Sequence, residues 1–389
     1  MKILYISTPS FADCDFPLIK TFQQKGLDVT YLILLPCYAL RSTLVDIKKQ
    51  IQRTGIFLAT EYPEFRLYEK YMDMSKVYVS NRINQKSYSW SYMKENYLLW
   101  NFIKDGHYDI VHSTSLFSGI RTLYYRLNNH WVTTFHDPFP HSGEARGNYK
   151  KRYACAIKGS KGYVLLNESQ MMDFCNTYHV DSPRVLINRL GIYDNIRAFV
   201  SPDSKPKPKN VLFFGRISPY KGLVYLCEAM KLVHEEVPDA TLTIAGSGKM
   251  YFDTEPYKHL RYIEFRNHYI DMTELADLLS RCSISVCPYT DATQSGVIMT
   301  SFSLYKPVVA TNVGGLGEMI DDGKSGLLVS PKDPKALAEA IISLLSDEDK
   351  LSVMSEYIRH EYNFGSRSWV AIADKYIEYY KMILETQSV

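Results

Sequence analysis

A chain of 389 residues is too long for one ordinary hydrophobic core and fits two domains of roughly 150 to 200 residues each. With 46% hydrophobic and 22% charged residues, its composition is typical of soluble globular proteins, and no apolar run approaches the roughly 20 residues of a membrane span. The net charge of +3 conceals an asymmetry, because residues 1–200 hold 25 Lys and Arg against 17 Asp and Glu. Such a basic half favours contact with an anionic membrane surface or a phosphate-bearing molecule, unless it reflects ordinary charge scatter.

The cysteines do not form a pattern typical of a disulfide framework or a zinc site. Their number is odd, and no two of them form a close C-x-x-C pair. A zinc site would need four ligands from unrelated segments. We therefore expect a cytosolic protein without a metal. The seven cysteines are Cys14, Cys37, Cys155, Cys175, Cys227, Cys282 and Cys287.

The first half begins with a strand, a helix and a second strand. The apolar runs "KILYIS" and "DVTYLILL" flank the helical pattern "FPLIKTFQQKGL", which ends at Gly26 as helices often do. The opening run of about four apolar residues is too short for a signal peptide. Strand-like runs return in "YDIVHSTS", "HWVTTFHD" and "GYVLLNES". Right-handed crossovers between such strands predict a parallel sheet.

Residues 61–104 are unusually rich in tyrosine. Aromatic and cationic side chains in alternation can stack the bases of single-stranded nucleic acid. An amphipathic helical insertion that packs its rings on the first domain fits the same pattern, and we favour it. No nucleic-acid partner is expected.

A proline- and lysine-rich segment, "SPDSKPKPKN" at 201–210, predicts a linker between the domains. Residues 1–200 then form the first domain, and residues 211–365 form a second doubly wound unit with five buried-type strands. The final segment, 366–389, has aromatic and apolar residues at helical spacing, which is more typical of a packed helix than of a site. The predicted fold class is α/β, with two Rossmann-like domains.

Two cations follow the first strand of the second domain in "FFGRISPYKG". The strand ends at Gly215, so Arg216 and Lys221 project from the carboxyl edge of the sheet, where open α/β sheets bind ligands. The two side chains fit a diphosphate, the first through forked hydrogen bonds and the second as a compact charge. The alternative is a pair of solvated surface cations.

A second loop, "CPYTDATQSGVIMT", joins a strand to a helix. We expect the unpaired N–H groups of Gly296, Val297 and Ile298 to bind an anion, with Gln294 and Ser295 beside them. The alternative is an ordinary strand-to-helix turn capped by Ser295.

In their order along 211–345, "GR...YKG", "AGSG", "FRNHYIDMTELADLL", "CPY...QSGV", "KPVVAT" and "GG..E" resemble the donor-binding half of family 4 glycosyltransferases, which are retaining enzymes of GT-B architecture. "VTTFHDPFPHSG" resembles, more loosely, the strand that carries the family's sugar-facing histidine. The resemblance implies that Arg216 and Lys221 bind the donor diphosphate, that the Gly296 loop holds its phosphates, and that His136 contacts the sugar. It also implies that the final helix, 366–389, packs back on the first domain.

The sequence departs from this family at two glutamates. In the family the first glutamate touches the transferred sugar or phosphate and the second grips the ribose hydroxyls. Aligned on "KPVVA", these positions hold Ala292 and Thr300. We interpret the chain as an active branch, because Arg216, Lys221 and His136 are all kept. An inactive relative is the alternative.

The remaining candidates are weaker. The resemblance places Asn267 and His268 beside the nucleotide base, and Glu318 either bonds the ribose or caps the next helix. His141 is a candidate for the acceptor side. A metal site at "HDPFPH" is disfavoured because prolines interrupt it and no further ligand is apparent.

The sequence thus predicts a cytoplasmic retaining glycosyltransferase that moves a sugar from a nucleotide diphosphate sugar to a glycan or lipid-linked acceptor in surface polysaccharide biosynthesis. No cofactor or metal is expected. Peripheral contact with the cytoplasmic membrane face is compatible with the basic first half. Two alternatives stay open: a non-catalytic GT-B protein that binds a sugar nucleotide or a partner enzyme, and a GT-B sugar-nucleotide epimerase. The epimerase would want acid and base carboxylates, which this loop lacks.

Overall fold

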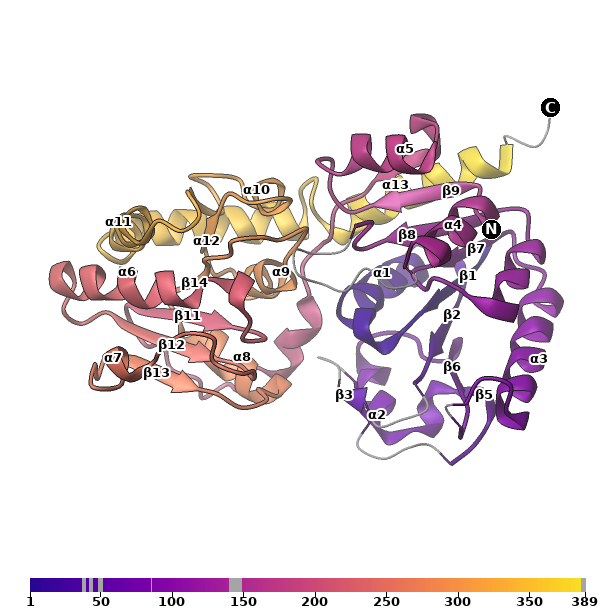
Figure 1. Cartoon of the computed structure of the whole chain (residues 1–389), viewed down its shortest axis with the longest axis horizontal. Helices are drawn as coiled ribbons and strands as arrows, with labels where there is room; N and C mark the ends of the chain where they lie inside the picture. The colour runs from indigo at the N-terminus through magenta and orange to yellow at the C-terminus, as the bar shows by residue number, and fades with distance from the viewer. Residues whose placement is uncertain (37–39, 42–44, 48–51, 85, 140–148, 386–389) are drawn as a thin grey trace. The chain divides into compact units, whose positions relative to one another are not determined.

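The computed structural model describes residues 1–36, 40–41, 45–47, 52–84, 86–139 and 149–385. These residues form two compact units, drawn in Figure 1. Unit 1 contains the described residues up to Leu190 together with Trp369–Glu385, and unit 2 contains Gly191–Ser368.

The described part of unit 1 contains an eight-stranded sheet in the order β10-β9-β8-β7-β1-β2-β6-β5. Every neighbouring pair is parallel except β5 and β6. The predicted parallel sheet is therefore present. The strands are β1 (Lys2–Ser7), β2 (Asp28–Leu34), β5 (Gly55–Leu58), β6 (Val77–Asn81), β7 (Ile110–Ser113), β8 (Trp131–Phe135), β9 (Gly162–Leu165) and β10 (Val185–Ile187), beside a separate antiparallel pair, β3 (Leu40–Arg41) and β4 (Asp46–Ile47).

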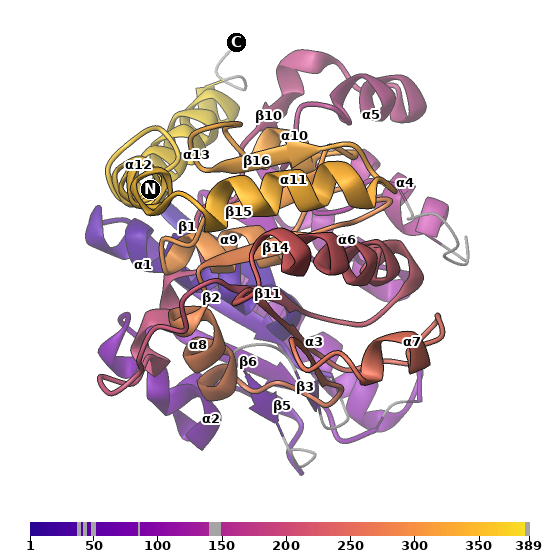
Figure 2. The same cartoon turned by 90° about the vertical axis from the view of Figure 1, so that its left-hand side faces the viewer.

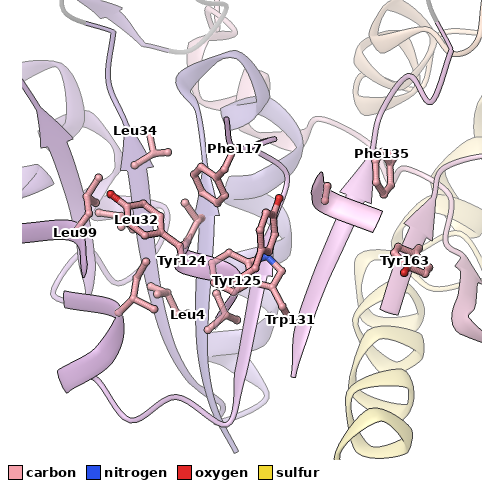
Figure 3. Packing of buried hydrophobic residues seen from close by; sticks show 14 of the residues in the cluster. Leu4, Leu32, Leu34, Leu99, Phe117, Tyr124, Tyr125, Trp131, Phe135 and Tyr163 are labelled. Atoms are coloured by element: carbon pink, nitrogen blue, oxygen red, sulfur yellow. The ribbon is translucent and has the colours of Figure 1, made fainter. Parts of the chain in front are cut away.

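Helices cover both faces of this sheet, so its strands read as continuous apolar runs. On β1, Leu4 belongs to a core with Leu99 of α3, whereas Tyr5 points to the face that α1 and α13 cover. Figure 3 shows the core that contains Leu4 and Leu99. The helices of unit 1 are α1 (Ala12–Gln24), α2 (Pro63–Arg66), α3 (Trp90–Asp105), α4 (Tyr149–Gly159), α5 (Met171–Tyr178) and α13 (Trp369–Glu385), with the 3-10 turns η1 (Pro9–Phe11), η2 (Ala59–Glu61), η3 (Leu67–Lys70), η4 (Gly119–Arg126) and η5 (Ser182–Arg184).

The final helix, α13, completes unit 1 through buried polar contacts. The Tyr379 hydroxyl accepts from the N–H of Tyr163 at 2.9 Å. His112 of β7 contacts the Tyr380 hydroxyl through Nδ1 and the Thr134 hydroxyl through Nε2. The helix therefore belongs to the sheet of unit 1 although it follows unit 2 along the chain.

Unit 2 is built on a six-stranded parallel sheet in its described residues, in the order β13-β12-β11-β14-β15-β16. In this unit α6 packs against α11 (Figure 2). The helices α8 and α9 both contact η6 (Asp194–Phe199). The strands are β11 (Asn210–Phe214), β12 (Thr241–Ala245), β13 (Ile263–Arg266), β14 (Ile284–Cys287), β15 (Val308–Thr311) and β16 (Gly326–Val329). The helices are α6 (Leu223–Glu236), α7 (Glu255–Lys258), α8 (Met272–Arg281), α9 (Gly296–Ser303), α10 (Leu316–Met319), α11 (Pro334–Leu345) and α12 (Glu348–Asn363), with η7 (Pro219–Lys221).

The boundary between the units lies earlier than the sequence predicts, between Leu190 and Gly191. The predicted linker, 201–210, is part of unit 2. The N–H of Lys207 donates to Arg281 at 2.8 Å, and the hydroxyls of Ser204 and Ser280 lie 2.6 Å apart. The proline- and lysine-rich composition of 201–210 predicts an irregular backbone, but it did not reveal these hydrogen bonds to α8.

Two further observations concern the described residues. None of their helices combines the length and the apolar composition that crossing a bilayer requires. All six cysteines that the structure describes carry free thiols. Cys37 lies outside the described residues.

Candidate functional site

The strand order of unit 2 reverses at β11, whose neighbours are β12 on one side and β14 on the other. Open parallel sheets bind ligands at the carboxyl ends of the strands beside such a reversal. The loop 215–222 follows β11, and the loop 288–295 follows β14. The two segments that the sequence predicts to hold a diphosphate therefore meet at this point.

Close backbone contacts fix these two loops to each other. The N–H of Thr290 donates to the carbonyl of Tyr220 at 2.7 Å. Gly222 has φ of +67°, and a Cβ atom there would lie 1.9 Å from the carbonyl oxygen of Pro288. Only glycine fits without moving the backbone, so the loop carrying Lys221 is held against the end of β14.

Lys221 is the central cation of this site. Its Nζ lies 3.6 Å from the ring centroid of Tyr289, which is fully buried. Within the described part of the chain, no carboxylate lies at ion-pair distance from Lys221. Burial lowers the pKa of Lys221 to about 8; Cys287 opposes this shift and Arg216 adds to it. A partly buried ammonium without a carboxylate partner is suited to bind an anion.

The second predicted cation, Arg216, is exposed to solvent. Its guanidinium donates to the Tyr220 hydroxyl at 3.4 Å. Tyr220 in turn packs edge-on against Tyr289. The two tyrosines connect both cations to the end of β14, and sequence reasoning missed them. The sequence did place each tyrosine in a candidate loop, in "PYK" and in "CPY", and this could have drawn attention to them.

The start of α9 agrees only in part with the prediction. Gly296 and Val297 occupy its first two positions, where N–H groups have no intrahelical acceptor. The N–H of Ile298, in contrast, donates to the carbonyl of Ser295 at 3.2 Å, so it is not unpaired as the sequence predicted. Ser295 occupies the N-cap position, but its side chain makes no capping hydrogen bond, and its hydroxyl donates to the Tyr289 hydroxyl at 3.3 Å instead. Gln294, next to Ser295, is half-buried.

Glycines also bring other loops to the same edge. Gly215 lies beside α9, since a Cβ atom added there would be 3.6 Å from a methyl group of Val297. Gly314 has φ of +48°, and a Cβ atom there would lie 1.8 Å from the carbonyl oxygen of Ala292. The backbone after β15 is therefore packed on the loop after β14.

Thr300 is not placed to bind a ligand as a hydrogen-bond donor. Its side chain is buried, and its hydroxyl donates to the carbonyl of Gly296 at 2.8 Å. Ala292 is buried and carries no polar side-chain atom. Neither position offers a replacement for a carboxylate.

The candidates beyond β13 and β15 are engaged in local contacts. The Asn267 amide exchanges hydrogen bonds with the backbone of Gly248, at 3.2 and 3.1 Å. His268 lies 3.0 Å from a carboxylate oxygen of Glu274. Glu318 is half-buried in α10, and its carbonyl accepts from Arg367 at 3.1 Å. Asn267 therefore shapes the loop after β12.

His136, the candidate from unit 1, directly follows β8. Its ring is stacked on Phe11, with centroids 3.8 Å apart. Burial lowers the pKa of His136 to about 3, so the imidazole is neutral at physiological pH. It can take part in a hydrogen bond but cannot act as a fixed cation. His141 lies outside the described residues.

No group of three His, Cys, Asp or Glu side chains in the described residues is arranged to hold a metal ion. The carbonyl of Asp137, beside His136, accepts a hydrogen bond from Tyr153. His141 lies outside the described residues, so a metal site at "HDPFPH", which the sequence disfavours, stays untested.

Comparisons with known proteins place these observations in a family context. Residues 208–347 match the family model described as "Glycosyl transferases group 1". The structure of HepE from Anabaena in complex with UDP-glucose is similar over 100% of this chain and 99% of that chain, with a TM-score of 0.63 and 16% identity. The chain has the GT-B fold. Its two parallel-sheet units are the two α/β domains of that architecture.

Most of the curated relatives match this GT-B chain over only part of its length. An uncharacterized glycosyltransferase of Methanocaldococcus jannaschii is 32% identical over 148 residues, which are 37% of this chain and 40% of that protein. A D-inositol 3-phosphate glycosyltransferase of Thermobispora bispora is 26% identical over 323 residues, 72% of each protein. The first relatives that the chain matches are covered over only 40% to 54% of their own length.

Proposed function

We propose that this protein is a retaining glycosyltransferase that transfers a sugar from a nucleotide diphosphate sugar to a glycan or lipid-linked acceptor. The observation that carries the proposal is Lys221, a partly buried ammonium at the reversal point of the sheet that pairs with no carboxylate of the described residues. The match to the group 1 model and the UDP-glucose complex of HepE support the choice of a nucleotide sugar. A place in family 4 and a role in surface polysaccharide biosynthesis rest on the sequence resemblance.

The chemistry that fits this site is stabilisation of a departing diphosphate. As the sugar–oxygen bond breaks, negative charge grows on the leaving group. Lys221 supplies a positive charge in a partly buried position, and Arg216 supplies several guanidinium N–H donors. The N–H groups of Gly296 and Val297 add the anion-binding N-terminus of a helix. The neutral His136 would bond a sugar hydroxyl. The diphosphate itself accepts the acceptor's proton, so this scheme needs no carboxylate base.

A screen of nucleotide sugars by thermal shift tests the proposed function. We expect a uridine or guanosine diphosphate sugar to raise the Tm of the protein, because a ligand at 100 times its Kd adds about 2.7 kcal/mol to the free energy of unfolding. A nucleoside that lacks the diphosphate should give a much smaller shift. Failure of every nucleotide diphosphate to stabilise the protein would exclude the proposal.

A non-catalytic sugar-nucleotide-binding protein is the second candidate, because Ala292 and Thr300 leave no carboxylate at the two family positions. Both candidates bind the donor. They differ in turnover, which includes slow hydrolysis of the donor by water. Donor binding without turnover, with water or any acceptor tested, would favour the second candidate.

Turnover is expected to survive excess chelator. The positive charge that a divalent ion would bring to the diphosphate is already present in Lys221, Arg216 and the start of α9. The measurement is the rate of UDP or GDP release with and without the chelator. Complete loss of activity, restored by adding back a divalent ion, would show that the donor binds as a metal complex.

Nucleotide affinity is expected to fall as the pH rises above about 8. The pKa of Lys221 is lowered to about 8 in the free protein, so the side chain loses its charge there. A bound diphosphate favours the charged form and raises that pKa, so binding takes up a proton. The dissociation constant of UDP should therefore increase by up to about tenfold per pH unit above pH 8.

Lys221→Arg is the matched control for this pH dependence, because arginine keeps its charge throughout the range. Titration of the nucleotide itself is common to both proteins. Calorimetry between about pH 7 and 9 should give a steeper decline for the native protein than for the variant. Identical profiles would remove Lys221 from the binding of the diphosphate.

Peripheral contact with a membrane is a further part of the proposal. Trp90, Met93 and Tyr97 lie on one side of α3 at helical spacing, and Trp90 is 85% exposed. Exposed aromatic side chains with basic neighbours are typical of surfaces that contact lipid headgroups. Flotation with anionic vesicles tests this contact, and an equal recovery with uncharged vesicles or none would argue against it.

A further inference from the structure

The strand order of the sheet in unit 1 also reverses at one point, and this point is separate from the proposed donor site in unit 2. The strand β1 lies between β2 and β7, so the strand order reverses there. A pocket of about 380 Å³ lies at the carboxyl ends of these three strands. It is within the size range of small-molecule sites. Its walls include Ser10 after β1, Leu35 after β2, Ser115 and Phe117 after β7, and Arg121 and Arg152.

Ser115 is a buried hydroxyl of this pocket, with 9% of its surface exposed. Among the described residues, no group lies at hydrogen-bond distance from its Oγ. The Ser115 backbone is fixed, because its N–H and carbonyl both bond the hydroxyl of Ser113, at 3.0 and 2.7 Å. Buried hydroxyls are normally satisfied by protein, water or ligand. The Oγ of Ser115 is itself closed to solvent, so this residue shapes the wall, and the hydroxyl-bearing residues Thr8, Ser10 and Ser118 also line the pocket.

Arg121 is held in place before any ligand arrives. Its Nε donates to Asn96 at 2.9 Å, and its NH2 group pairs with the buried carboxylate of Glu95. Arg82 lies 3.5 Å from the same carboxylate. Two guanidinium groups on one carboxylate leave a net positive charge. The Arg121 side chain thus presents charge to the pocket at a small cost in conformational entropy.

Arg152 of α4 adds a second cation to the wall. It is exposed, and no carboxylate of the described residues lies at ion-pair distance from it. The described residues that line the pocket include no carboxylate. The lining also includes the apolar side chains of Leu34, Leu35 and Phe117. The pocket therefore combines two cations and several hydroxyls with apolar side chains.

We infer that this pocket binds a phosphate group of the acceptor. The inference rests on the proposed function, since it takes the ligand of unit 1 to be the acceptor. Guanidinium forks and hydroxyl donors match the three or more oxygens of a phosphate better than the two of a carboxylate. The phosphate belongs either to a lipid-linked acceptor or to a water-soluble sugar phosphate, and both present the same group to Arg121 and Arg152.

The test is binding of inorganic phosphate to the full-length protein, by calorimetry at constant ionic strength, with UDP present in excess to fill the donor site. Arg152→Gln is expected to weaken phosphate binding by about tenfold, as loss of a charge-assisted contact does. Arg126→Gln is the matched control, because Arg126 is an exposed cation of the same unit that does not line this pocket. Equal phosphate affinity in the two variants would overturn the inference.

Arg121→Lys gives a second variant that keeps the charge beside Glu95 and loses the fork. It should fold normally and also bind phosphate more weakly. UDP affinity should be the same in all these proteins, so a failure of UDP binding would count against the proposed function and not against the pocket. Acetate is the probe for a carboxylate site, and acetate binding as tight as that of phosphate would also overturn the inference.

Dodecyl phosphate below its micelle concentration and glycerol phosphate distinguish the two sources. Tighter binding of dodecyl phosphate, weakened by Arg152→Gln, supports a lipid-linked phosphate lying along the apolar side chains. Equal binding of the two probes, with the same dependence on Arg152, supports a water-soluble sugar phosphate. Binding of neither probe would contradict the assignment of the pocket.

Discussion

Lys221→Ala is expected to lower kcat/KM for the nucleotide sugar by on the order of a hundredfold. A hydrogen bond to a charged group contributes about 1.5 to 3 kcal/mol, and each 1.4 kcal/mol corresponds to a factor of ten. Because charge on the diphosphate grows as the sugar departs, part of this loss should appear in kcat. The rate is measured by nucleotide release, with acceptor or by hydrolysis of the donor.

Thr300→Val is the matched comparison for this experiment. The hydroxyl of Thr300 is already donated to Gly296 inside α9, and a neutral hydrogen bond contributes only about 0.5 to 1.5 kcal/mol. Its effect on kcat/KM should therefore be about tenfold or less. Both variants need unchanged circular dichroism and cooperative unfolding. If Thr300→Val proves the more damaging of the two, the loop acts through the ribose and the diphosphate-led account fails.

His136→Ala is expected to reduce turnover by roughly a hundredfold, the effect typical of losing one preorganised hydrogen bond to the reacting group. The dissociation constant of UDP should change by less than about twofold, because the proposed diphosphate contacts are all in unit 2. The contrast separates a role in the reaction from a role in nucleotide binding. Kinetics and calorimetry on the same preparation provide both numbers.

His136→Phe controls for packing in this second experiment. A phenyl ring can keep the stack on Phe11 but cannot form a hydrogen bond. We expect this variant to be as inactive as His136→Ala and more stable. Retained turnover in His136→Phe would mean that the native ring serves only the packing of unit 1. Equal losses of turnover and of UDP affinity would lead to the same conclusion.

The sheets were the most predictable part of the structure. Strands that are covered on both faces are apolar along their whole length, so β1, β8, β11 and β14 could be located from short hydrophobic runs. The meeting of the two loops that we propose to hold the diphosphate followed from this, because parallel strands align their carboxyl ends. The unit boundary was misplaced because proline and lysine indicate an irregular, hydrated backbone and say nothing of its hydrogen bonds.

The details of the site depended on contacts that no local pattern encodes. Lys221 and Tyr289 are far apart in sequence, and only the sheet brings them together. The N–H of Ile298 bonds the carbonyl of Ser295 in a tight first turn of α9, whereas the sequence led us to expect an unpaired N–H at this position. The pocket proposed to bind phosphate combines residues that follow β1 and β7 with Arg152 of α4, and none of them belongs to a recognisable motif.

The position of α13 has a consequence for how the protein is made. Tyr376 and Tyr380 contact the ring of His112 in the middle of the first sheet, but they follow all the described residues of unit 2 along the chain. A ribosome adds roughly 5 to 20 residues per second. The aromatic face of β1 and β7 therefore stays without its cover for on the order of ten seconds while Gly191–Ser368 emerges. The second unit can be finished before the first, so nascent chains are most exposed to chaperones and to aggregation through the sheet that was translated earliest.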